Sequence, residues 1–432
     1  MVKYFTKVLD TLKISNGAGT YILAVLTMII IPVYHWFLPP CLILWFIFYL
    51  IELRKRKLEV LNINPRYKIL FTLFLLFLTW QVIGILYSYN TRGGWRNIEL
   101  HISLLIFPLL LVSPWEMIRQ RSTSLLRLFA LSTFMYLLIC YGYAFYRSLD
   151  FQNGILTFHP TLPLYTWLNY FYGLEFAIFQ HTSYLSMFAL FSVFIALEAF
   201  FDASVARRNR YFWIIVSIIL LGSIYFLSSR ALMLASIIMV PFYLFRKFKK
   251  IGKNKYLGSG VVAVIFVFLI ISLTNPRVNN YFKWRSGKTL GDIGLKDDRF
   301  VIWNSANKIL KQNLVFGVGT GDIQDELNKE YLRTGNIKLA QANTNAHNQY
   351  MEIILENGLI GLILFLSLFA MMFYISITEK NILYMMFLLI VFFSFIFETM
   401  LNRLAGVSFF ALFSFLLIHN KSNSVPEKMI IH

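Results

Sequence analysis

Three basic side chains stand out as groups that could bind or activate a substrate. Arg230 follows FLSS and precedes ALMLAS, Arg299 stands in DDRFVIW, and His347 stands in NTNAHNQYMEIILENGLIG. An Arg guanidinium offers a planar fork of donors that matches phosphate oxygens. An imidazole can take a proton from a hydroxyl near neutral pH. Together, these side chains could hold a phosphorylated group while a hydroxyl is activated.

A structural interpretation of each residue also stays open. Arg230 could be an Arg at a turn that extends its charge to the membrane edge, Arg299 a solvated loop residue, and His347 a structural His. The polar run 343–349 can cap a helix whose N-terminus favours a bound anion, which makes Asn348 a candidate contact. Gly358 and Gly361 have the spacing of a close helix contact.

The composition decides what kind of protein must position these groups. Of the 432 residues, 58% are hydrophobic and only 14% are charged, whereas a soluble domain has about 25% charged residues. A soluble enzyme, a disordered chain and a disulfide scaffold are therefore excluded. Apolar runs of spanning length recur along the chain, and we expect an all-α polytopic membrane protein. About twelve spans are predicted, near 18–34, 37–53, 67–88, 98–114, 124–146, 181–201, 211–228, 231–246, 257–274, 349–376, 382–398 and 402–419.

The net charge of +19 would suggest nucleic acid in a soluble protein, but here it has another explanation. Lys and Arg concentrate in alternate short connections, as expected for cytoplasmic loops, and no nucleic-acid partner is predicted. The orientation that follows places both termini in the cytoplasm. It places the segments 147–180 and 275–346 outside, which in a bacterial inner membrane is the periplasm.

This layout predicts four parts. Residues 1–274 hold the first nine spans, 275–346 form a periplasmic loop, 347–419 hold the last three spans, and 420–432 form a cytoplasmic tail. Apolar residues recur at helical spacing between Asp297 and Lys311 and again between Gly321 and Arg333. The loop is therefore expected to contain two amphipathic helices that lie on the membrane face.

Other groups on the predicted periplasmic side are weaker candidates. The glycines of GVGTGD at 317–322 resemble a phosphate-binding loop, but no strand precedes them and a tight turn is the alternative. Arg92 and Arg96 could contact phosphates or could simply be solvated. His181 and His159 flank an aromatic segment that indicates an interfacial belt, with sugar stacking as the alternative. Cys41 and Cys140 show no metal-ligand or disulfide spacing.

Several of these segments together resemble the O-antigen ligase/polymerase family of bacterial membrane glycosyltransferases, and the ligases most closely. Arg230 with Leu234 matches one family motif. The second motif is matched by His347, Asn348, Gly358 and Gly361. The loop with Arg299 near Trp303, followed by a Gly-rich turn, is also similar. These motifs cover roughly 225–365, and the N-terminal half matches no motif of the family.

The resemblance implies a fold similar to the GT-C glycosyltransferases. It implies a donor glycan on undecaprenyl diphosphate, an acceptor of lipid A–core, and no required metal, nucleotide or other cofactor, with membrane lipids as the surroundings. It also implies catalytic or binding roles for Arg230, Arg299 and His347. In a single displacement that inverts the sugar, the Arg residues would bind the leaving diphosphate and His347 would act as base or orient the diphosphate.

Three rival functions stay open. An O-antigen polymerase shares the donor and the topology, and a protein O-oligosaccharyltransferase uses the same donor on a protein. A lipid or polysaccharide transporter is the alternative that is not an enzyme. Transporters commonly show internal repeats and charged residues in mid-span, whereas the ionisable groups here gather at the outer rim.

Overall fold

The described part of the chain is almost entirely helical. The computed structural model describes residues 17–55, 64–112, 116–152, 155–161, 169–251 and 299–420. The predicted span 257–274, the predicted loop up to residue 298 and the tail from residue 421 lie outside these ranges. Within them, the helices long and apolar enough to cross a membrane are α4 (Pro65–Leu86), α8 (Ser122–Ser148), α9 (Thr182–Phe201), α10 (Arg207–Leu227), α11 (Arg230–Ile251) and α17 (Gln349–Thr378). The protein is a multi-pass membrane protein, as its composition predicts.

Shorter apolar helices fill the places of further predicted spans. These are α2 (Ala18–Val33), α3 (Leu38–Lys55), α18 (Ile382–Phe397) and α19 (Leu404–His419). The short elements between helices are η1 (His35–Phe37), α7 (Glu116–Gln120), η3 (Gly173–Glu175) and η4 (Met400–Asn402). The total of twelve spans and the four-part division of the chain stay predictions.

The expected span at 98–114 differs from the structure. Two short helices occupy this region, α5 (Thr91–His101) and α6 (Ser103–Leu111), and they meet at Ile102. The first begins earlier than predicted because the Asn90 side chain accepts a hydrogen bond from Gly93 N. The His101 ring lies within hydrogen-bonding distance of Gln81 and of the Leu401 carbonyl, which fixes the junction against neighbouring helices.

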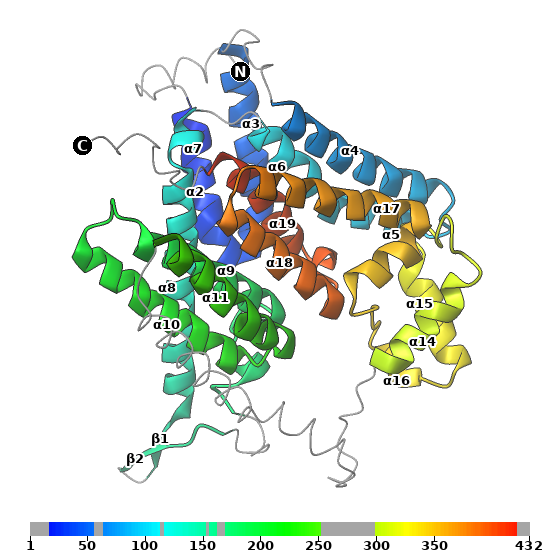
Figure 1. Cartoon of the computed structure of the whole chain (residues 1–432). Coiled ribbons are helices and arrows are strands. Elements are labelled where there is room, and N and C mark those ends of the chain that lie inside the picture. Colours follow the sequence, from blue (N-terminus) through cyan, green and yellow to red (C-terminus); the bar gives the residue numbers. More distant parts are fainter. Residues whose placement is uncertain are drawn as a thin grey trace.

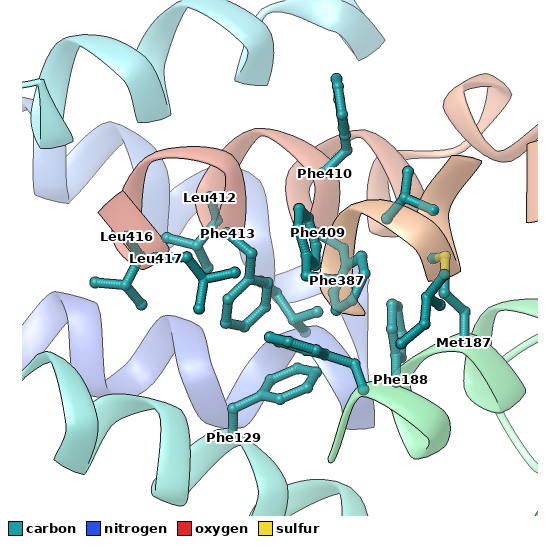
Figure 2. Packing of buried hydrophobic residues seen from close by; sticks show 14 of the residues in the cluster. Phe129, Met187, Phe188, Phe387, Phe409, Phe410, Leu412, Phe413, Leu416 and Leu417 are labelled. Carbon is teal, nitrogen blue, oxygen red and sulfur yellow. The ribbon is translucent and has the colours of Figure 1, made fainter. Parts of the chain in front are cut away.

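Helix α9 forms the centre of the bundle. Most of its side chains are buried, and it packs against α8, α10, α11 and α18. Figure 2 shows aromatic side chains of α8, α9, α18 and α19 filling this core, among them Phe129, Phe188, Phe387, Phe409 and Phe413. Because lipid tails are as apolar as these side chains, close van der Waals packing rather than the hydrophobic effect stabilises such contacts in a membrane.

A small helical subdomain follows the undescribed segment. Its helices are α14 (Arg299–Leu310), α15 (Ile323–Arg333) and α16 (Ile337–Gln341), grouped to one side of the bundle beyond the ends of α4 and α17 (Figure 1). The first two confirm the amphipathic helices expected there, and α16 is additional. Ile302, Ala306, Leu327 and Tyr331 form a core of their own.

A β-hairpin continues from the end of α8 and was not predicted. Strand β1 (Leu149–Gln152) pairs antiparallel with β2 (Ile155–Phe158), with Leu149 opposite Phe158 (Figure 1). Arg147, in the last turn of α8 before the hairpin, pairs with Glu175 at 2.6 Å and lies 4.1 Å from the centre of the Tyr170 ring. Tyr172 packs near Tyr225, whereas 162–168 lie outside the described ranges. The interfacial-belt interpretation of this segment stays a prediction.

Candidate functional site

The turn before α17 holds His347 in an unusual backbone conformation. Its φ of 46° lies in the left-handed region, which costs a residue with a Cβ about 1–2 kcal/mol. Three contacts hold the turn: His347 N donates to Asn345 Oδ1 at 3.1 Å, Ala346 N donates to Glu352 Oε2 at 3.0 Å, and Trp303 Nε1 donates to the Ala346 carbonyl at 3.0 Å. The subdomain and the first turn of α17 thus fix the direction of the imidazole.

The imidazole forms a pair with the carboxylate of Glu398, the residue that directly follows α18. His347 Nδ1 lies 2.8 Å from Glu398 Oε1, just after the C-terminus of that helix. An ionised carboxylate can only accept, so the geometry requires the proton on Nδ1 and leaves Nε2 as the proton acceptor. The His347 side chain is 36% exposed and that of Glu398 only 16%, so the acid is covered and the base is accessible.

The charge state of Glu398 follows from its neighbours. Burial alone would raise the pKa of Glu398, but the hydrogen bond from His347 and the electrostatic interactions with His347, His181 and Arg299 outweigh burial. The net result is a pKa below the ordinary value, so the carboxylate is ionised at neutral pH. Glu398 therefore carries the negative charge that orients the imidazole and stabilises it when it takes up a proton.

Arg299 lies beside this pair. It begins α14, and its Nη2 donates to the Phe397 carbonyl at 3.1 Å, next to Glu398 in the chain. Its guanidinium carbon lies 6.0 Å from the centre of the Phe397 ring. The structure therefore brings Arg299 and His347 close to the same carboxylate, that of Glu398.

The N-terminus of α9 completes the cluster. His181 caps this helix, with Ser183 N donating to its Nδ1 at 3.4 Å, and Ser183 Oγ donates to Glu398 Oε2 at 3.5 Å. Arg403, which is exposed between η4 and α19, lies 6.0 Å from the Tyr184 ring of the same α9 turn. Two guanidinium groups, those of Arg299 and Arg403, thus lie at this end of the bundle, where they favour an anionic ligand.

A buried layer of polar groups at the start of α17 and in η4 supports the cluster around His347 and Glu398. Glu352, fully buried in the first turn of α17, accepts hydrogen bonds from Asn402 Nδ2 at 2.7 Å and from Ala346 N. Gln349 Oε1 accepts from Leu401 N at 2.7 Å. These bonds join the His347 turn to η4, so the backbone on both sides of the His347–Glu398 pair is held by the same helix.

Arg230 lies at the same end of the bundle. It begins α11, which packs against α9 and α18, and its side chain is exposed. Ser228, two residues earlier, has a φ of 57° and makes the reversal between α10 and α11. The contact of Arg230 with substrate stays a prediction.

The remaining predicted contacts are more distant or have structural partners. Asn348 caps α17, with its Oδ1 accepting from Met351 N at 3.0 Å. Arg92 and Arg96 are exposed on α5, whose far end reaches η4 through His101. Within the described ranges, no three His, Cys, Asp or Glu side chains converge in a group that could hold a metal ion.

The glycine turn at 317–321 is a packing junction. Val318 N and Gly319 N donate to the carbonyls of Leu355 and Glu356 on α17, and Gly321 N donates to Ser88 Oγ. Its backbone donors are therefore used within the protein, which supports the tight-turn interpretation over a phosphate loop.

Gly358 differs from the expectation of a regular helix face. Its φ of 67° breaks α17, and an added Cβ would lie 2.1 Å from the Val315 carbonyl oxygen. The break lets 314–319 pair with 355–359 through backbone hydrogen bonds. Both Gly358 and Gly361 are structural, as the sequence suggested, but Gly358 acts through its backbone conformation.

Comparison with known proteins identifies the segment that carries much of this site. Residues 215–366 match the family model described as O-antigen ligase. This segment is an O-antigen ligase family domain. The domain includes Arg230, Arg299 and His347, and its family implies glycan transfer in the membrane from lipid-linked glycans. No curated protein matches the chain.

The ligase-family domain ends before Glu398 and begins after His181. Sequence analysis missed Glu398, Arg403 and Glu352 as members of the site. One signal for Glu398 was present: it is an acid placed directly after a long apolar run, on the side predicted for His347. The sequence does not show that Glu398 contacts the His347 turn, which lies about fifty residues earlier in the chain.

Proposed function

We propose that this protein is an O-antigen ligase that transfers a glycan from undecaprenyl diphosphate to a sugar hydroxyl of lipid A–core. The observation that carries the proposal is the His347–Glu398 pair with Arg299 beside it, at the edge of a ligase-family domain. We place this end of the bundle in the periplasm and both termini in the cytoplasm, on the distribution of Lys and Arg.

The residues suggest a single displacement. Nε2 of His347 takes the proton of the acceptor hydroxyl, whose oxygen attacks the anomeric carbon of the donor glycan. The bond from that carbon to the phosphate oxygen breaks, and undecaprenyl diphosphate leaves with the bonding electrons. Attack from the face opposite the leaving group inverts the anomeric centre.

The leaving group needs charge stabilisation more than it needs a proton. Arg299, with Arg403 and Arg230 at the same end, can donate charge-assisted hydrogen bonds to the phosphate oxygens as negative charge builds up. Glu398 holds the imidazole in the basic tautomer and balances the positive charge that it gains. The reaction takes its free energy from the diphosphate linkage of the donor.

The decisive experiment combines a deletion strain with variants. In a strain that lacks this protein, electrophoresis of lipopolysaccharide should show lipid A–core without attached polymer, while lipid-linked polymer still accumulates. His347→Ala should fail to restore attachment, with transfer by the purified protein about 10²–10⁴-fold slower. Lys311→Ala is the control, because Lys311 is exposed directly after α14 and belongs to none of the candidate groups. Normal attachment by His347→Ala would refute the base role, and a single attached repeat unit in the deletion strain would identify a polymerase.

A second variant tests the phosphate role of Arg230. Arg230→Lys keeps the charge but loses the planar fork, and transfer should fall about 10-fold. Kinetics equal to those of the wild type would exclude two-point phosphate binding by this residue.

A further inference from the structure

A groove of about 640 Å³ opens at the end of the bundle opposite His347. It lies between the first turns of α8 and α10, and the connection from α9 to α10 closes its end. Helix α9, with twenty residues or about 30 Å of rise, separates this connection from the His181 end. The groove is thus one membrane thickness away from the candidate site and belongs to a different surface.

The lining divides into a polar end and an apolar wall. Ser124, Arg127, Ser204 and Asn209 gather near the helix starts, whereas Leu128, Leu131 and Phe212 continue along the helices. Phe212 is exposed, and the exposed Met135 and Ile215 extend the apolar surface further along α8 and α10. The groove is therefore continuous with the surface that these spans present to lipid tails.

The charge around the polar end is positive. Asp202 neutralises one of the positive charges, because it pairs with Arg127 at 2.6 Å and also accepts from Ser204 Oγ at 2.7 Å. Arg207 and Arg208 are exposed at the first two positions of α10, directly after the lining residue Ala206. A negatively charged group at this end would meet the exposed guanidinium groups of Arg207 and Arg208 beside the Arg127–Asp202 pair.

We infer that this groove binds an anionic phospholipid, with the phosphate at the polar end and an acyl chain along the apolar wall. The volume suits a small headgroup with the first part of a chain. Basic recesses between spans on the cytoplasmic side are typical sites for anionic lipid headgroups. A soluble phosphate ester would use only the polar end and would leave Leu128, Leu131 and Phe212 exposed. The inference requires no particular glycan donor or acceptor, so it stands apart from the proposed function.

Native mass spectrometry of the purified protein, with equal phosphatidylglycerol and phosphatidylcholine added, tests the site. We expect one phosphatidylglycerol retained with about 10-fold preference. Leu131→Trp fills the apolar wall and should remove this one lipid, and Arg207→Gln/Arg208→Gln should reduce the preference to near unity. Arg246→Gln is the matched control, because Arg246 is exposed at the same end on α11 and does not line the groove. Thermal unfolding in detergent verifies that each variant is folded.

Other occupants give different results. Equal retention of the two lipids by the wild type, or unchanged preference in both groove variants, would overturn the site. Displacement of the lipid by millimolar glycerol phosphate would assign the groove to a soluble phosphate ester. A dimer that Leu131→Trp dissociates would instead make it a contact between two copies of the chain.

Discussion

Two turns that contact the N-terminal half of α17 look alike in sequence and differ in what their residues contact. The turn around His347 and the glycine turn at 317–321 are both short, rich in small or polar residues, and next to helix starts. In both, backbone donors are bound within the protein, by Asn345 and Glu352 in one and by α17 and Ser88 in the other. Only the first leaves an accessible side chain beside a carboxylate.

The contrast between the two turns shows which feature allows a turn to take part in a reaction. Free backbone N–H groups, which a glycine-rich motif suggests, are absent from the part of the glycine turn that meets α17. What distinguishes the His347 turn is a reactive side chain whose direction is fixed by buried partners. Variants of each turn should therefore fail in different ways, in transfer for one and in stability for the other.

Glu398→Gln should have the largest effect. The amide keeps the shape but loses the negative charge that stabilises a protonated imidazole, and its NH₂ can face Nδ1 and favour the wrong tautomer. Transfer should fall about 100-fold, or ~2.7 kcal/mol, in steady-state kinetics, with KM for the lipid-linked donor little changed. A rise in KM with kcat unchanged would show that Glu398 serves donor binding instead.

Gly321→Ala should damage the other turn. An added Cβ would lie 2.0 Å from the Asn90 carbonyl oxygen, a backbone atom that cannot rotate away. We expect a loss of about 1–3 kcal/mol of stability, seen as lower thermal stability in detergent, with transfer per folded molecule retained. Gly222→Ala on α10 is the control, because nothing lies within 4 Å of its added Cβ. Loss of transfer without loss of stability would contradict the packing role.

Glu352→Gln tests whether the buried layer positions His347. The amide offers one oxygen in place of two, so it cannot accept from Asn402 and from Ala346 as well as the carboxyl group does. We expect kcat to fall about 5- to 10-fold while KM for donor stays constant, and Glu352→Ala to fall further. A kcat equal to that of the wild type in both variants would show that the buried layer only stabilises the fold.

The sequence predicted those features that depend on local pattern. Apolar runs located α10 within a few residues, and helical periodicity located α14 and α15. The motif residues Arg299 and His347 lie near one another in the fold, and their roles in transfer stay a proposal. Contacts between distant segments could not be predicted from the sequence. Glu398 meets His347 only because α18 ends beside the turn before α17. The break at Gly358 was missed because an αL glycine inside an apolar run has the same sequence as a packing glycine.

The smallest effect should be the pH dependence of stability that comes from Glu398. Its pKa in the folded protein lies below the ordinary value of about 4.5, so its carboxylate stabilises the fold above that pH. This contribution is lost as pH falls through the lowered pKa, because the folded protein then gains the proton that the unfolded chain already holds. Wild type should therefore unfold at a higher temperature than Glu398→Gln at pH 7, and this difference in unfolding temperature should close toward pH 3.

Glu330→Gln gives the comparison in the subdomain, where Arg333 and Lys308 lower the pKa of Glu330. Its gap should close in the same direction without any loss of transfer. A Glu398 gap that stays constant with pH would show that the glutamine variant loses packing rather than charge.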